Sequence, residues 1–196
     1  MLRQALVLWT LVFVIILFVW KGKHDVKLQK IAYSLPEVDS NLDILMTIRA
    51  TSQNYESRLR YSLETWWKSV SNVVYVISDD VIPEQSLKMR SLLGDHLIET
   101  SCGPNYSNPS LACKCQAELD LFYKAEARWS CRMDDDSYVN LPVLKRTLAR
   151  YNADVPMVIG RITAKPLPLT FRGKKHDIVF PTGNALCMSF PLVKCL

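Results

Sequence analysis

The sequence predicts an α/β domain with a largely parallel sheet, on three observations. Short apolar runs rich in β-branched residues recur along the chain, and each has the length of a buried strand. Segments with apolar residues at helical spacing separate these runs. Acidic residues directly follow two of the runs, Val73–Ser78 and Trp129–Met133. Strands that alternate with helices are typical of βαβ units, whose parallel strands end at the same edge of a sheet.

Each element follows from its own local pattern. The segment 57–70 carries Leu59, Leu63, Trp66, Trp67 and Val70 on one helical face. The helices are expected at residues 57–70, 83–93, 112–128 and 142–151. The strands are expected at residues 42–50, 73–78, 94–100, 128–134 and 156–160. Residues 177–190 predict a short strand, a turn at Thr182–Gly183 and an apolar tail. Glycine and prolines mark 102–110 as a loop.

The first residues predict a membrane anchor. Residues 5–20 contain no charged side chain, and Lys21 and Lys23 follow. As a helix this segment spans roughly 24 Å, slightly less than a hydrocarbon core of about 30 Å. We therefore expect a tail at 1–4, a signal-anchor transmembrane helix at 5–20, a stem at 21–41 and a folded domain at 42–196. A cleaved signal peptide and a buried core helix are the alternatives, although "VWKGKHD" is a poor cleavage site.

The orientation of that anchor depends on conflicting signals. The lysines after the span would place the C-terminal part in the cytosol by the positive-inside rule. Six cysteines without zinc-ribbon spacing, and the N-glycosylation acceptor Asn105-Tyr106-Ser107, favour an oxidising lumen. We give the cysteines and the acceptor more weight. The net charge of +5 is scattered, and no nucleic-acid motif accompanies it.

Three consecutive aspartates, Asp134, Asp135 and Asp136, lie at the end of the strand expected at 128–134. Like charges beside a buried strand repel one another and lose hydration. A divalent cation such as Mg²⁺ or Mn²⁺ removes both costs, because hard cations bind carboxylates and phosphates together. A solvated acidic turn that caps the next helix is the alternative.

Seven segments are similar to those of the Fringe-type β-1,3-glycosyltransferases. "RWSCRMDDDSYVN" resembles the metal-binding segment of that family, and "CGPNYSNPSLACKCQAELDLF" resembles its cysteine loop and following helix. The other matching segments are "SRLRYSLETWW", "VYVISDD", "NLPVLKRTL", "MVIGR" and "FPTGNALC". The resemblance extends from about Leu42 to Cys187.

The resemblance implies a GT-A (Rossmann-like) fold, a UDP-sugar donor and Mn²⁺. It implies transfer of N-acetylglucosamine in β-1,3 linkage to O-linked fucose on EGF-like repeats, with Notch-like glycoproteins as acceptors. It also implies a single-pass type II protein of the Golgi membrane with a lumenal domain. The implied disulfides are Cys102–Cys113 and Cys131–Cys187, whereas Cys115 and Cys195 have no counterpart.

The resemblance also implies roles for individual residues. Asp136 would hold Mn²⁺, and Asp134 and Asp135 would contact the metal shell or the nucleotide. Asp79 would lie near the uridine. Thr51 and Arg58 would contact the nucleotide. The alternatives are that Thr51 and Arg58 only cap and solvate a helix and that Asp79 is a turn residue.

Two departures from the family pattern limit these expectations. The turn "FATGGAGFC" of the family is here "FPTGNALC", and the family continues beyond the position of Leu196 with a general base and a metal-binding histidine. We therefore expect an incomplete GT-A domain whose general base is absent, with Asp177 a candidate by position only. The segment 171–176 would reach phosphates or form a solvated loop. A non-catalytic homologue that binds UDP-sugar or a full-length transferase is the alternative function.

Overall fold

The computed structural model describes residues 35, 43–79, 83–162, 165–179 and 181–196. The predicted anchor at 5–20, most of the stem and Asp80 lie outside the described residues. Within the described part of the chain, no helix has the length and apolar character that a membrane crossing requires.

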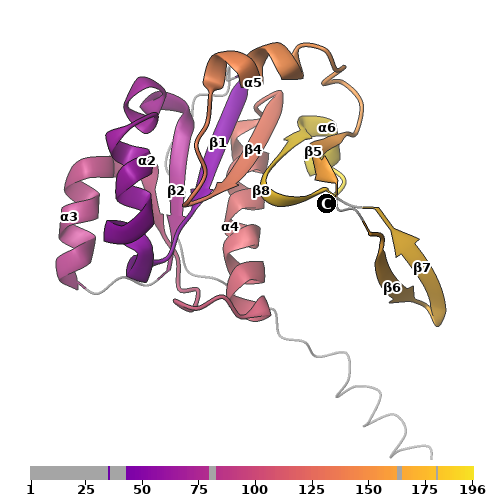
Figure 1. Cartoon of the computed structure of the whole chain (residues 1–196), viewed down its shortest axis with the longest axis horizontal. Coiled ribbons are helices and arrows are strands. Elements are labelled where there is room, and N and C mark those ends of the chain that lie inside the picture. The colour runs from indigo at the N-terminus through magenta and orange to yellow at the C-terminus, as the bar shows by residue number, and fades with distance from the viewer. Residues whose placement is uncertain (1–34, 36–42, 80–82, 163–164, 180) are drawn as a thin grey trace, which may run out of the picture. The chain divides into compact units, whose positions relative to one another are not determined.

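A six-stranded sheet with the order β3-β2-β1-β4-β8-β5 forms the centre of the domain (Figure 1). Its strands are β1 (Ile44–Arg49), β2 (Val74–Ser78), β3 (Leu97–Glu99), β4 (Trp129–Asp134), β5 (Val158–Ile162) and β8 (Pro181–Ser189). The first four in that order are parallel, and β8 runs antiparallel to both β4 and β5. The predicted α/β class with a mostly parallel sheet is thus confirmed, and it is compatible with a GT-A-like fold.

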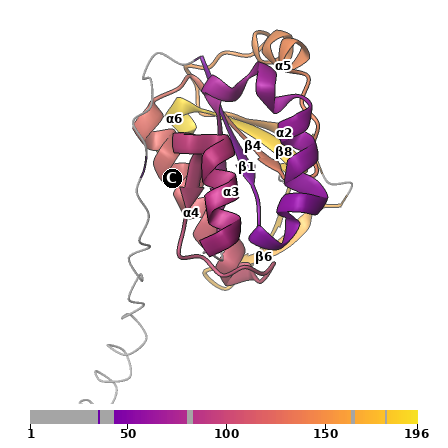
Figure 2. The ribbon, with the colours of Figure 1, turned by 90° about the vertical axis from the view of Figure 1, so that its left-hand side faces the viewer.

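Helices cover both faces of this sheet. They are the π-helical turn η2 (Tyr55–Leu59), α2 (Arg60–Glu64), α3 (Pro83–Leu93), α4 (Asn108–Ala125), α5 (Leu141–Leu148) and α6 (Phe190–Val193). Short 3₁₀ turns η1 (Ser52–Asn54), η3 (Trp67–Ser69), η4 (Ser71–Val73) and η5 (Gly94–His96) connect them to the strands. Strand β1 lies between α2 and α4 when the domain is viewed from the side (Figure 2).

Alternate residues of the central strands enter two separate cores. Met46 and Ile48 of β1 pack with the side chains of η2, α2, α3 and α5, whereas Leu45 packs with α4 and α6. All three side chains are fully buried. This period of two explains why β1 is apolar at nearly every position, as expected for a parallel strand covered on both faces.

Helix α4 begins four residues earlier than expected. Ser107 is its N-cap, and the Ser107 hydroxyl accepts a hydrogen bond from the Ser110 N–H at 3.4 Å. Pro109 lies in the first turn of the helix, where its missing N–H has no intrahelical partner to lose. Pro109, which predicted a loop, therefore marks the start of this helix, whereas Pro104 lies in the loop as expected.

Two further expectations are wrong. The segment 57–70 is a regular α-helix only at Arg60–Glu64, with a π-helical turn before it and a 3₁₀ turn after it. The predicted turn at Thr182–Gly183 lies inside β8. The chain reverses instead in a hairpin of β6 (Leu167–Phe171) and β7 (Lys174–Ile178), whose turn residues have positive φ angles of 50° and 75°. Such values favour a tight hairpin turn.

Two disulfides join separate elements of the domain. Cys131 of β4 pairs with Cys187 of β8, directly across the antiparallel ladder. Cys102 pairs with Cys113 and joins the loop after β3 to the first half of α4. These are the two pairings that the resemblance implies. Cys115 is a half-buried free thiol, and Cys195 is an exposed one.

Candidate functional site

The carboxyl ends of β2, β1 and β4 lie side by side, because these three strands are adjacent and parallel. Arg49, the last residue of β1, is in register with Ile77 of β2 and with Asp134 of β4. Thr51 and Asp79 lie just after β1 and β2, and Asp134, the last residue of β4, is followed by Asp135 and Asp136. The topology therefore brings the predicted site residues to one edge of the sheet.

Asp79 is completely buried and holds the turn that follows β1. The Asp79 carboxylate accepts hydrogen bonds from the Ser52 N–H at 2.8 Å, the Ser52 hydroxyl at 3.1 Å and the Ser78 hydroxyl at 3.0 Å. The Tyr55 hydroxyl donates in turn to Ser78 Oγ. Both carboxylate oxygens of Asp79 thus accept hydrogen bonds within the protein. This geometry favours a role in stabilising the turn after β1 over direct contact with a ligand.

The turn at Thr51–Asn54 contacts both acidic segments. Its Ser52 binds Asp79, and the side chain of its Asn54 hydrogen bonds to Asp135. Thr51 is 4% exposed, and within the described residues its Oγ1 has no hydrogen-bond partner. A buried hydroxyl without a partner costs free energy unless a ligand or water satisfies it. Thr51 therefore fits the predicted nucleotide contact.

The aspartate turn is held from the α2 side of the site. The Ser62 hydroxyl lies 3.4 Å from the carbonyl oxygens of Asp135 and Ser137, and Trp66 Nε1–H donates to the Ser137 carbonyl at 3.1 Å. Arg58 Nη1 is 3.6 Å from Asp135 Oδ1 and 3.5 Å from an oxygen of Asp136. The guanidinium therefore bridges two carboxylates at the surface.

The carboxylates of this turn lie in environments that disfavour their charge. Burial raises the pKa of Asp134 above its ordinary value, although Arg49 and Arg132 oppose the shift. Burial also raises the pKa of Asp135, against the hydrogen bond from Asn54 and the charge of Arg58. Raised pKa values mean that the ionised carboxylates lack sufficient positive charge around them. An added cation would correct that imbalance.

An open cleft of about 290 Å³ lies beside these residues. Arg58, Tyr61 and Thr65 line it together with Asp135, Asp136 and Tyr138. Tyr61 and Tyr138 are largely exposed. A cleft with a guanidinium, two carboxylates and two aromatic rings has the groups needed to bind a nucleotide and its phosphates.

Helix α4 contributes two buried charges to this edge that the sequence reasoning did not identify. Lys114 Nζ donates to the Ala50 carbonyl at 2.9 Å and lies 3.8 Å from Asp79 Oδ1. Glu118, one helical turn later, pairs with Arg49 at 2.5 Å. Both side chains are almost fully buried. The sequence pattern that could have identified them is a pair of opposite charges at positions i and i+4 on the same helix face as Leu121, Phe122 and Ala125.

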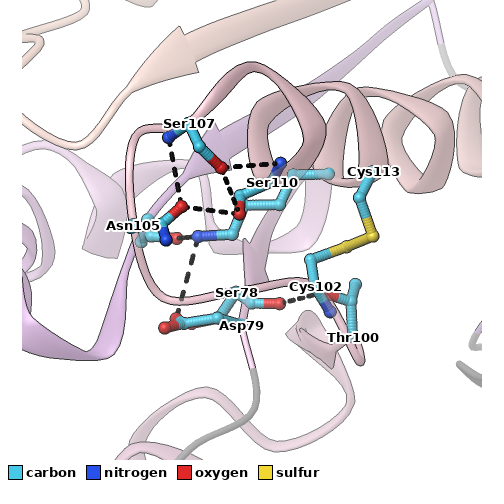
Figure 3. The surroundings of a disulfide bond; sticks show 10 residues. Ser78, Asp79, Thr100, Cys102, Asn105, Ser107, Ser110 and Cys113 are labelled. Atoms are coloured by element: carbon cyan, nitrogen blue, oxygen red, sulfur yellow. Dashed lines mark hydrogen bonds and ion pairs between the residues drawn. A yellow bond between two sulfur atoms is a disulfide. The ribbon is translucent and has the colours of Figure 1, made fainter.

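The predicted glycosylation site lies on the loop next to this edge (Figure 3). Asn105 Oδ1 accepts hydrogen bonds from the Ser107 N–H at 3.1 Å and the Ser110 hydroxyl at 2.7 Å. The neighbouring Tyr106 hydroxyl bonds to the Asn54 amide. Asn105 itself is exposed, as an acceptor of an N-glycan must be.

A divalent metal fits this donor set only in part. Among the described residues, no three histidine, cysteine, aspartate or glutamate side chains converge as a complete metal site. Asp134 and Asp136 supply hard carboxylate oxygens with an excess of negative charge, which suits Mn²⁺ or Mg²⁺. The remaining ligands would come from phosphate oxygens and water, the usual arrangement for such ions with nucleotides.

Comparison with known proteins identifies the class. A family profile described as "Fringe-like" matches residues 40–196. The Drosophila melanogaster Fringe glycosyltransferase is 30% identical over 79% of this chain and 38% of its own length. The human β-1,3-N-acetylglucosaminyltransferase manic fringe is 34% identical over 61% of this chain and 36% of its own length. The zebrafish (Danio rerio) lunatic fringe enzyme is 32% identical over 75% and 40%.

The chain belongs to the Fringe-like family. It spans about two fifths of the length of these curated relatives. The matched part contains the parallel sheet, the acidic turn and both disulfides described above.

Proposed function

We propose that this chain binds a UDP-sugar and forms the donor side of a Fringe-type glycosyltransferase. The donor sugar is N-acetylglucosamine, and the acceptor is O-linked fucose on EGF-like repeats of Notch-like glycoproteins, with a β-1,3 linkage formed. The observation that supports this function best is the cleft in which Arg58, Asp135 and Asp136 meet beside the Thr51–Asn54 turn. The names of the relatives support the sugar and the linkage.

The predicted site residues in the cleft and next to it have the following roles in this proposal. Asp136 holds Mn²⁺, and Asp134 and Asp135 contact the metal shell or the nucleotide. Arg58 turns from the two aspartates toward the diphosphate, for which its planar guanidinium is suited. Thr51 contacts the nucleotide through its unpartnered hydroxyl. Bound Mn²⁺ would stabilise the negative charge that develops on the departing UDP.

A non-catalytic homologue that binds UDP-sugar or a full-length transferase is the second candidate. An inverting transfer needs a base that takes the proton of the acceptor hydroxyl. Of the carboxylates in the described residues, Asp135 and Asp136 line the cleft, and both already face Arg58. Asp177 lies on the exposed strand β7, in a separate two-stranded sheet. This arrangement favours donor binding without transfer.

The cellular setting is part of the proposal. We propose a single-pass type II protein of the Golgi membrane, anchored by residues 5–20, with residues 42–196 in the lumen. Two disulfides and the exposed acceptor Asn105 support an oxidising, glycosylating compartment.

Calorimetric titration of the full chain in mild detergent with UDP, with and without Mn²⁺, tests the donor site. Metal-dependent binding is expected, and a folded sample that binds no UDP contradicts the proposal. Incubation with UDP-N-acetylglucosamine and an O-fucosylated EGF-like repeat then separates the two candidates. Sugar transfer identifies an enzyme, whereas UDP binding without transfer identifies the non-catalytic homologue. UDP-galactose in the same assay tests the choice of sugar.

A further inference from the structure

The buried side chain of Lys114 reaches the turn that follows β1. Lys114 is 0% exposed, although lysine is among the residues least often buried. Burial lowers its pKa, and the nearby charges of Asp79, Asp135 and Glu118 oppose that shift while Arg49 adds to it. Burying a charged lysine costs free energy. Its contacts therefore indicate which part of the structure the side chain stabilises.

Those contacts are with the backbone and a carboxylate at the end of β1. Lys114 Nζ donates to the Ala50 carbonyl at 2.9 Å, and Asp79, its ion-pair partner, accepts the Ser52 N–H at 2.8 Å. The two residues on either side of Thr51 are therefore fixed by one ion pair. Thr51 lies between them with the unpartnered buried hydroxyl.

The two ion pairs at this edge together carry no net charge. Lys114 and Arg49 are positive, and Asp79 and Glu118 are negative. Helix α4 supplies both Lys114 and Glu118, and the Cys102–Cys113 disulfide anchors the residue directly before Lys114. Figure 3 shows the disulfide, Asn105 and Asp79 near the beginning of α4. The pair is thus preorganised by the fold.

We infer that Lys114 is a positioning residue for the nucleotide donor, which acts by fixing the backbone on both sides of Thr51 through Ala50 and Asp79. This inference rests on the proposed function, because it concerns the same donor site. It assigns Lys114 no contact with the nucleotide. A purely structural role, in which Lys114 only neutralises Asp79, is the alternative.

Two variants of the full chain separate these roles. Lys114→Met removes the donor to Ala50 and leaves Asp79 as an unpaired buried charge, which is expected to destabilise the fold strongly. Asp79→Asn/Lys114→Met removes both charges, and it is expected to recover much of the lost melting temperature while Ala50 still lacks its donor. Lys124→Met, an exposed lysine near the end of the same helix, is the matched control.

The first readout is the affinity for UDP with Mn²⁺. We expect the double variant to bind UDP about tenfold more weakly than the wild type, equivalent to about 1.4 kcal/mol, and Lys124→Met to bind normally. A double variant that folds and binds UDP like the wild type would overturn the inference, since charge balance alone would then suffice. If Lys114→Met does not fold, the double variant decides.

The second readout needs no ligand. Hydrogen exchange of the backbone amides at residues 51–54 should be faster in the double variant than in the wild type, and unchanged in Lys124→Met. Equal exchange rates would overturn the inference. A wild-type chain that binds no UDP contradicts the proposed function, and in that case faster exchange in the double variant still supports the positional role of Lys114.

Discussion

The carboxylate of Asp79 accepts the backbone N–H of Ser52 at 2.8 Å, so the end of β2 fixes the turn that leaves β1. Asp79 is completely buried, and its ion-pair partner Lys114 is buried as well. Breaking one partner of such a pair leaves the other as an unpaired charge in the protein interior.

Replacement of Asp79 by alanine should therefore destabilise the domain by about 3–5 kcal/mol. Urea unfolding of the purified chain measures the loss. Asp43→Ala is the control, because Asp43 is exposed and its pair with Arg128 is on the surface, and it should change stability by less than about 0.5 kcal/mol. Equal effects of the two substitutions would show that the Asp79 contacts contribute nothing.

Asp136→Ala should abolish the metal-dependent part of UDP binding. Asp136 is the exposed member of the acidic turn and the proposed Mn²⁺ ligand. UDP titrations with and without Mn²⁺ measure how much the metal increases the affinity for UDP. This increase should be at least about tenfold smaller in Asp136→Ala than in the wild type. Asp154→Ala, an exposed aspartate outside the cleft, should bind as the wild type does. Metal-dependent binding that survives unchanged in Asp136→Ala would remove Asp136 from the site.

The raised pKa of Asp134 predicts a pH-dependent cost to stability. A carboxyl whose pKa is raised on folding stabilises the folded state while it is protonated. This contribution is complete at pH values below the ordinary pKa of 3.8, and it is lost as the pH rises through the pKa of the folded state. At pH 7 without metal, Asp134→Asn should therefore melt at a higher temperature than the wild type.

Each kcal/mol of difference in unfolding free energy corresponds to a shift of about 2–4 °C in the melting temperature of a domain of this size. The difference between Asp134→Asn and the wild type should shrink as the pH falls toward about 3, where Asp134 is protonated in both folded and unfolded chains. Melting curves across this range, with Asp154→Asn as the control, check the sign. A lower melting temperature for Asp134→Asn at pH 7 would mean that the ionised carboxylate is stabilised by its surroundings.

The two disulfides should contribute unequally to stability. Loop-closure entropy predicts a loss of about 3 kcal/mol for Cys102→Ser/Cys113→Ser and about 4 kcal/mol for Cys131→Ser/Cys187→Ser, because the sequence separations are 11 and 56 residues. Chemical unfolding under non-reducing conditions measures both. Cys195→Ser should be neutral, since that thiol is exposed. A larger loss of stability for Cys102→Ser/Cys113→Ser would show that the packing of β4 against β8 compensates for removal of the Cys131–Cys187 bond.

The parts of the fold that could be predicted are those with local patterns. The predicted end of strand β4 agrees with the structure, because a buried apolar run is a local signal. Helix α3 lies at Pro83–Leu93 as predicted, because an initial proline is a local signal as well. The parallel topology then predicted that Asp79 and Asp134 would lie at one edge. The hairpin at 167–178 was missed, because its proline and lysines hide the period of two and Arg172–Gly173 alone marks the turn.

The support for the candidate site could not be predicted, because it depends on contacts between distant segments. Lys114 reaches Ala50 across 64 residues, and Trp66 reaches Ser137 across 71. No local pattern states which carbonyl a buried lysine will meet. The resemblance indicated the aspartates, whereas the side chains that hold them became visible only in the fold.

The bond between Cys131 and Cys187 has a consequence for proteolysis. The exposed hairpin turn at Arg172–Gly173 offers a cleavage site for trypsin. A chain cut there would keep its last segment, since β8 remains covalently tied to β4 on the far side of the cut. Such a nicked protein would migrate as one band on a non-reducing gel and as two after reduction. The central sheet, with the acidic turn at its edge, would thus retain all its strands although the polypeptide is no longer continuous.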